Sequence, residues 1–162
     1  MALFGVPTPY PDHARRAVAA AIDMQAALMG LQARWWAEGM PAIDIGIGIN
    51  TGPLVVGNIG SRHRLDFTVI GDTVNPAERL EKLNRQLGTR ILIAQPTYEL
   101  VKEAVRVRGP LHVQVEGRAQ EIAVYEVLGW QTGQPRSEDR SPDLPRGRGA
   151  WQPLSPAQRS GP

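Results

Sequence analysis

The chain has 162 residues, of which 42% are hydrophobic, so it is long and apolar enough for one packed domain with additional segments. It contains no cysteine, which excludes a disulfide, a thiolate nucleophile and a sulfur-rich metal site. No apolar run approaches the roughly 20 residues that cross a bilayer. Prolines also interrupt the first stretch before the apolar core of a signal peptide could form, at Pro7, Pro9 and Pro11.

The formal net charge of +2 is confined to the end of the sequence. Residues 131–162 hold five arginines and three acidic residues, so the rest of the chain is neutral and no nucleic-acid partner is indicated. The same stretch holds six of the fourteen prolines, and a segment of this kind cannot bury enough apolar surface to offset its ordering entropy. We predict a domain over residues 1–129 and a disordered tail, rich in Pro, Gly and Arg, over residues 130–162.

The first forty residues predict a long amphipathic helix. Residues 1–6 are apolar, as in part of a strand, and residues 7–11 form a proline-rich loop. Asp12 is a plausible N-cap, and Gly39 is expected to end the helix. Apolar residues recur between them at helical spacing, and we expect this stripe to face the core: Ala17, Val18, Ala21, Ile22, Met24, Leu28, Leu31 and Trp35.

A strand is expected next, because isoleucine occupies every second position from Ile43 to Ile49. Its other face carries Gly46 and Gly48, so a helix, a ligand or another subunit could approach it closely. Residues 54–56 form a short apolar run that periodicity does not assign. Alternation over residues 65–70 predicts a second strand, which Gly71 closes.

The next helix has two possible starts. Asn75 could be its N-cap, followed by Pro76 and Glu78, or the helix could begin earlier, at Asp72 or Thr73, because the first turn tolerates proline. Its inward residues are expected to be Leu80, Leu83 and Leu87, and Gly88 stops it.

The remaining elements alternate again between strand and helix. We expect strands over residues 91–94, 105–108, 111–115 and 122–128, and a short helix over residues 96–103. This order predicts an α+β fold, with a mixed or antiparallel sheet covered by helices.

Three side chains around the strand–helix turn could hold a phosphorylated ligand. Asn75 and Arg79 are four residues apart and share a helix face, near a helix start whose backbone N–H groups favour an anion. The preceding strand brings Thr68 toward the same end. From the residues alone there is an alternative: Asn75 is a simple helix cap, Arg79 is a solvated charge and Thr68 is an ordinary strand residue. No His/Asp/Glu cluster has metal-ligand spacing, and residues 57–60 lack the lysine of a phosphate-binding loop.

Four stretches together resemble the class III adenylate and guanylate cyclases, especially the bacterial ones. In order and spacing they are DHARRAV at residues 12–18, GIGINTG at 46–52, VGNIGS at 56–61 and TVIGDTVNPAERLE at 68–81. The resemblance runs from residue 1 to about 128. It implies a ferredoxin-like domain that works as a dimer in intracellular signalling, either free in the cytoplasm or on the cytoplasmic side of a membrane-anchored protein.

The resemblance also implies a reaction and roles for single residues. Two Mg²⁺ or Mn²⁺ ions would assist attack of the ribose 3′-hydroxyl of ATP on the α-phosphate, giving cyclic AMP and pyrophosphate. Asn75 would orient the ribose and Arg79 would stabilise charge on the reacting phosphate. Thr68 stands where adenylate cyclases commonly place Asp or Thr to read the base, which favours ATP over GTP.

Two departures from the family pattern matter. The family's two metal-binding aspartates and its adenine-reading lysine lie upstream of the segment that resembles residues 1–5, so the chain resembles a domain without its first strands. The family's phosphate-contacting lysine is replaced by Glu116, and Arg118 could substitute for it. We therefore expect the chain alone to bind no metal and to be inactive. Three interpretations stay open: part of an adenylate cyclase, a non-catalytic dimerisation or regulatory module that pairs with a complete cyclase chain, or an inactive remnant.

Overall fold

The computed structural model describes residues 1–41, 43–61, 64–113 and 121–132. Within them three helices and six strands follow one another along the chain: α1 (His13–Ala37), β1 (Ile47–Ile49), β2 (Val55–Ser61), β3 (Arg64–Ile70), α2 (Val74–Leu87), β4 (Ile91–Ala94), α3 (Gln95–Val101), β5 (Val105–Val113) and β6 (Ile122–Trp130). The α+β class predicted from the sequence is confirmed.

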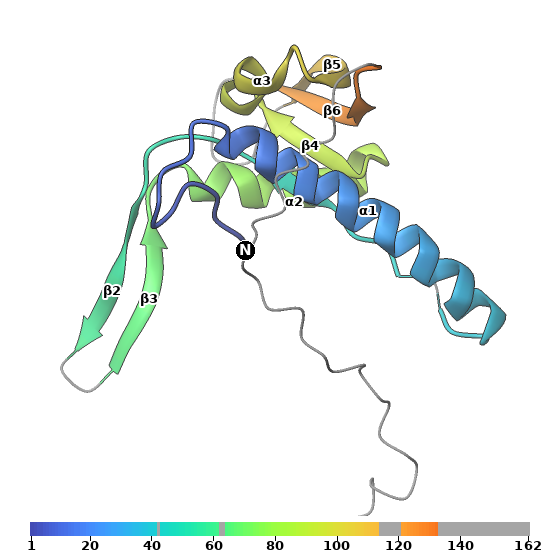
Figure 1. Cartoon of the computed structure of the whole chain (residues 1–162), viewed down its shortest axis with the longest axis horizontal. Helices are drawn as coiled ribbons and strands as arrows, with labels where there is room; N and C mark the ends of the chain where they lie inside the picture. The colour runs from blue at the N-terminus through green and yellow to red at the C-terminus, as the bar shows by residue number, and fades with distance from the viewer. Residues whose placement is uncertain (42, 62–63, 114–120, 133–162) are drawn as a thin grey trace, which may run out of the picture.

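Four of the strands form one mixed sheet in the order β1-β4-β6-β5. The β1–β4 pair is parallel, whereas β6 is antiparallel to both β4 and β5. Strands β2 and β3 form a separate antiparallel hairpin, which extends away from the sheet (Figure 1). Within the described residues β1 is therefore an edge strand, paired on one side only.

Helices cover both faces of the sheet. On one face α1 and α3 pack against alternate residues of β4, with Val18, Ile91, Ile93 and Val101 buried together. On the other face Leu80 of α2 packs against Leu92, Ala94 and Val124. Because β4 is covered on both faces, all four of its residues are buried, which explains its continuous apolar run.

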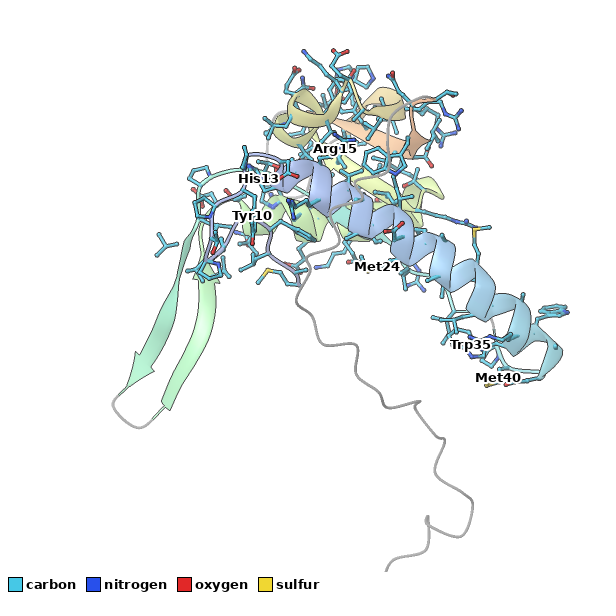
Figure 2. All side chains as sticks on the ribbon, in the orientation of Figure 1. Tyr10, His13, Arg15, Met24, Trp35 and Met40 are labelled. Carbon is cyan, nitrogen blue, oxygen red and sulfur yellow. The ribbon has the colours of Figure 1, made fainter. Side chains whose placement is uncertain are left out.

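The long helix α1 begins one residue after Asp12, as predicted, but the predicted cap bond is absent. The Asp12 carboxylate instead accepts a hydrogen bond from Arg16 Nε at 2.9 Å. The stripe that α1 buries is narrower than predicted, and Met24, which was expected in it, is 47% exposed. The buried residues of α1 are Ala14, Val18, Ala21, Gln25 and Leu28. Figure 2 labels Trp35 and Met40 at the C-terminal end of α1, which extends past the sheet.

The strand expected over residues 43–49 is shorter in the structure. Only Ile47–Ile49 is paired as a strand, because side chains of α1 take the preceding carbonyl groups. Gln25 Nε2 donates to the Ile45 carbonyl at 2.9 Å, and Gln32 Nε2 donates to the Ile43 carbonyl at 2.6 Å. The expectation that residues 1–6 form part of a strand is also wrong, since they are irregular in the structure.

The second long helix takes the earlier of the two predicted starts. Thr73 is the N-cap of α2, so Asn75 lies in the first turn rather than at the cap. Leu80 is fully buried as predicted, but Leu87 is 39% exposed. Gly88 ends the helix in a left-handed conformation with φ 64°.

The C-terminal part differs from prediction in its boundaries. The two strands expected around residue 110 are one strand, β5, with an irregularity between Arg108 and Leu111. The short helix α3 starts one residue earlier and ends two residues earlier than expected. The predicted domain boundary at residue 129 stays a prediction, and the predicted tail lies outside the described residues apart from 130–132.

Candidate functional site

The start of α2 carries two of the four predicted site residues. Asn75 is exposed in the first turn, and Arg79, one turn later, is half-buried. Four residues of helix place both side chains on one face. Neither side chain makes a hydrogen bond or ion pair with another residue in the described part of the chain. Both groups are therefore available to a ligand that approaches this face.

The other two predicted residues are less completely described. Thr68 lies in β3, where its backbone is paired opposite Gly57 of β2, and the placement of its side chain is outside the description. Arg118 lies outside the described residues. The structure therefore brings Asn75 and Arg79 together on one face of α2. The proposed roles of Thr68 and Arg118 in the site stay predictions.

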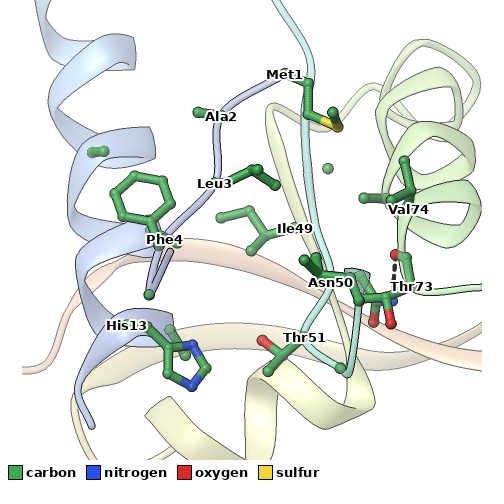
Figure 3. A pocket seen from close by; sticks show the side chains of 18 of the residues that line it. Met1, Ala2, Leu3, Phe4, His13, Ile49, Asn50, Thr51, Thr73 and Val74 are labelled. Carbon is green, nitrogen blue, oxygen red and sulfur yellow. Dashed lines mark hydrogen bonds between the residues drawn. The ribbon is translucent and has the colours of Figure 1, made fainter. Parts of the chain in front are cut away.

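The loop that follows β1 holds the start of α2. Thr73 Oγ1 donates to the Pro53 carbonyl at 2.6 Å, and Asn50 Nδ2 donates to the Thr73 carbonyl at 2.9 Å. Figure 3 shows Asn50 and Thr73 facing each other at this point. The Thr73 hydroxyl caps no backbone N–H of the helix. In the first turn the Val74 N–H donates to the Gly71 carbonyl at 3.2 Å and Pro76 has no N–H, which leaves the Asn75 N–H without an intrahelical partner.

Charges near Arg79 are paired along α2. Lys82 Nζ donates to Glu78 Oε1 at 2.7 Å, and this hydrogen bond lowers the pKa of the Glu78 carboxyl below its ordinary value. Both partners are largely exposed, so the pair adds little stability. The neighbouring Arg79 guanidinium also lowers the pKa of the Glu78 carboxyl.

A cleft of about 1030 Å³ lies beside the site, between residues 1–6 and α1 on one side and β1 and α2 on the other. Figure 3 shows Leu3 and Phe4 across from Ile49 and Thr51. Most of its walls are apolar, and the unpaired edge of β1 borders it. Asn75 and Arg79 do not line this cleft, so it is distinct from the helix face that carries these two predicted site residues.

The described residues contain no group of three His, Cys, Asp or Glu side chains that could hold a metal ion. The residues available here therefore do not fit a metal centre. None of the helices described in this chain is long and apolar enough to span a membrane.

Sequence reasoning assigned no role to two asparagines that organise this region. Asn50 belongs to the loop–helix contact described above, and Asn84 is 2% exposed. Asn84 Nδ2 donates to the Ile47 carbonyl at 3.1 Å and joins α2 to β1. The signal for Asn84 was available, because it lies four residues after Leu80 on the buried face, where an unpartnered polar side chain would be costly.

Comparisons with known proteins agree on one family. The adenylate and guanylate cyclase catalytic domain model matches residues 1–129. Adenylate cyclase 1 of Rhizobium meliloti (strain 1021) is 34% identical over 128 residues, which are 79% of this chain and 19% of that protein. An adenylate cyclase of Anabaena cylindrica is 41% identical over 92 residues, 55% of this chain and 18% of the relative. The chain thus spans less than a fifth of these relatives.

Solved structures show the same relationship. The crystal structure of the guanylyl cyclase Cya2 superposes with a TM-score of 0.71 at 37% identity, covering 80% of this chain and 65% of that one. The adenylyl cyclase CyaB from P. aeruginosa superposes with a TM-score of 0.70 at 32% identity, covering 82% of this chain and 68% of that one. Because the family model matches most of the sequence and the fold agrees, the chain belongs to the adenylate and guanylate cyclase catalytic domain family.

Proposed function

We propose that this chain is part of an adenylate cyclase that converts ATP to cyclic AMP and pyrophosphate. The observation that carries the proposal is the presentation of Asn75 and Arg79 on one face at the start of α2, inside the region that the cyclase family model matches. An amide and a guanidinium one turn apart can contact a ribose and a phosphate at the same time. The proposed partners are ATP and a second cyclase domain, as a homodimer or in a pair with a complete cyclase chain.

The proposed reaction needs positioning and charge stabilisation rather than a covalent nucleophile on the protein. The ribose 3′-oxygen forms a bond to the α-phosphorus, the bond from that phosphorus to the β-phosphate bridge oxygen breaks, and pyrophosphate and a proton are released. Asn75 would orient the ribose, and Arg79 would stabilise the negative charge that develops on the α-phosphate oxygens. Arg118 would contact phosphate.

The choice of ATP over GTP rests on Thr68. The relatives and neighbours include adenylate cyclases and a guanylyl cyclase, so family membership leaves the base open. A hydroxyl at this position can bond the adenine edge, and we propose that Thr68 reads it.

Metal ions are expected in the complete domain, as two Mg²⁺ or Mn²⁺ that assist the reaction. The described residues do not fit a metal site, so we assign this chain no metal ligand and derive no step through a metal ion. The same observation favours a second candidate function, a cyclase-like dimerisation or regulatory module without activity of its own.

A hybrid cyclase can test the proposed roles of Arg79 and Thr68 separately. In it, residues 1–129 replace the segment of the P. aeruginosa adenylyl cyclase to which they are similar. We expect Arg79→Ala to lower kcat by about 10²–10³-fold with a smaller change in KM, because its charge acts mainly on the transition state. Thr68→Ala should change the ratio of kcat/KM for ATP and GTP more than the overall rate.

Arg85→Ala is the matched control, because Arg85 is an exposed arginine in the last turn of the same helix. It should leave both kinetic constants near those of the unmodified hybrid. If Thr68→Ala and Arg79→Ala reduce turnover of both nucleotides equally, the division of roles is wrong and Thr68 is an ordinary strand residue.

A further inference from the structure

We propose that Thr73 and Asn50 are positioning residues for the cyclase reaction, acting through the backbone at the start of α2. The inference rests on the proposed roles of Asn75 and Arg79 and extends them to residues that touch neither substrate nor phosphate.

The need for such positioning follows from the side chains themselves. Asn75 and Arg79 make no hydrogen bond or ion pair with another described residue, so no polar contact of their own fixes where they lie. Their place is set by the backbone of the first turns of α2. A first helical turn lacks intrahelical partners for its N–H groups, and Pro76 contributes no N–H at all. Without an external contact this turn would open easily.

The external contact is a pair of hydrogen bonds, which we call the loop clamp: Thr73 Oγ1 to the Pro53 carbonyl at 2.6 Å and Asn50 Nδ2 to the Thr73 carbonyl at 2.9 Å. It joins residues 20 and 23 positions apart in the sequence. Gly52 lets the two segments meet, because a Cβ there would lie 2.6 Å from Thr73 Oγ1.

The loop side of the clamp is itself anchored. Asn50 directly follows β1, which is paired with β4 in the sheet. Thr51, the next residue, shares a hydrogen bond of 2.9 Å with the buried Thr97 of α3. The clamp therefore ties the start of α2 to the sheet and to α3, and the position of Asn75, two residues beyond Thr73, follows from it.

The other end of α2 supplies a matched control. Thr89 Oγ1 donates to Asn84 Oδ1 at 2.9 Å, just after the helix ends. Thr73→Val and Thr89→Val each remove one threonine hydroxyl with the same change of shape. Both are expected to lower stability, because a lost hydrogen bond typically costs about 1 kcal/mol. Only Thr73→Val removes part of the clamp.

Amide hydrogen exchange on the chain tests the clamp directly. In Thr73→Val, the amides of Ala77 and Glu78 should exchange about tenfold faster or more, because the first turn opens locally, while those of the last turn stay unchanged. Thr73→Ser retains the hydroxyl and should restore the slow exchange. In Thr89→Val the faster amides should lie at the C-terminal end instead. A uniform acceleration along α2 in Thr73→Val would overturn the proposal.

Kinetics in the hybrid cyclase test the consequence. Thr73→Val and Asn50→Ala should lower kcat for ATP by about 10- to 100-fold with little change in KM, as expected when reacting groups are displaced by about an ångström. Thr73→Ser should keep most of the turnover, and Thr89→Val should keep all of it when assayed well below its Tm. Equal kcat in Thr73→Val and Thr89→Val would mean that Thr73 is only structural. If the unmodified hybrid is inactive, the proposed function fails, and the exchange measurement still decides the clamp.

Discussion

Gly48 sets how closely α2 approaches β1. A Cβ on Gly48 would overlap the carbonyl oxygen of Ala77 and lie 2.5 Å from the Glu81 backbone nitrogen. The sequence predicted that something comes close to the bare face of this strand, and the structure identifies it as α2. Because both obstructing atoms belong to backbone, a side chain here cannot be accommodated by rotating a neighbour.

We expect Gly48→Ala to lower the free energy of unfolding by about 1–3 kcal/mol, since it overpacks a helix–strand contact. Gly30→Ala is the control: Gly30 lies in α1 with no atom near its missing Cβ, so alanine should raise stability by up to about 1 kcal/mol through its helix propensity. Urea denaturation of both variants measures the difference. Equal effects would mean that α2 does not pack this tightly.

Asp12 makes a small, pH-dependent contribution at the start of α1. The Arg16 hydrogen bond lowers the pKa of the Asp12 carboxyl below its ordinary value. A carboxyl whose pKa is lower in the folded state stabilises the fold above its unfolded pKa, and that stabilisation is lost as the pH falls through the folded value. Asp12→Asn should therefore make stability less dependent on pH below about 4, as measured by Tm from pH 2 to 7. If Tm in Asp12→Asn falls at low pH as steeply as in the unmodified chain, the Asp12–Arg16 pair does not contribute in this way.

At the scale of elements, the open edge of β1 is the feature with the clearest consequence. It borders the apolar cleft, and exposed strand edges beside apolar surface promote association. We expect the isolated chain to form oligomers with rising concentration, measured by light scattering, and to bind a hydrophobic dye.

Phe4 and Val55 allow a matched test of that expectation. Phe4 lines the cleft and is 38% exposed, whereas Val55 lies outside it on β2 and is 67% exposed. Phe4→Lys should reduce association and dye binding, and Val55→Lys should change them much less. A monomeric, cooperatively melting chain with no dye binding would refute the role of the cleft.

At the scale of the whole molecule, the described residues provide part of what the proposed reaction needs. They include Asn75 and Arg79, but no group of metal ligands exists among them. We expect the pure chain to produce no cyclic AMP from ATP with Mn²⁺ or Mg²⁺, because nothing would neutralise the triphosphate or activate the 3′-hydroxyl. The hybrid cyclase is the positive control. Metal-dependent cyclic AMP formation by the chain alone, above a buffer blank, would show that the expectation is wrong.

Several features could be read from the sequence because their causes are local. Helical spacing over residues 13–37 identified α1, Gly88 identified the end of α2, and the apolar run Ile91–Ala94 identified a strand. Each signal depends on residues within one or two turns of one another. The family came from four stretches taken together in order and spacing, and the last of them placed Asn75 and Arg79 near a helix start.

Other features depended on contacts between distant segments. Ile43 and Ile45 alternate like strand residues, but Gln25 and Gln32 take their carbonyl groups, so they are not paired as a strand. The sequence allowed two starts for α2. The hydrogen bond from Thr73 to the Pro53 carbonyl, 20 residues away, accompanies the earlier one.

The sequence by itself therefore determined the class of fold, the family and the two residues that α2 presents. Hydrophobic periodicity and the turn-forming effects of glycine and proline depend on only a few neighbouring residues, so they can be recognised in the sequence alone. Only the tertiary structure decided that β1 lies at an edge of the described sheet, which of the two starts α2 takes, and that Asn50 and Thr73 make hydrogen bonds at that start. Those outcomes depend on which distant donors and acceptors meet, and no local pattern in the sequence encodes that.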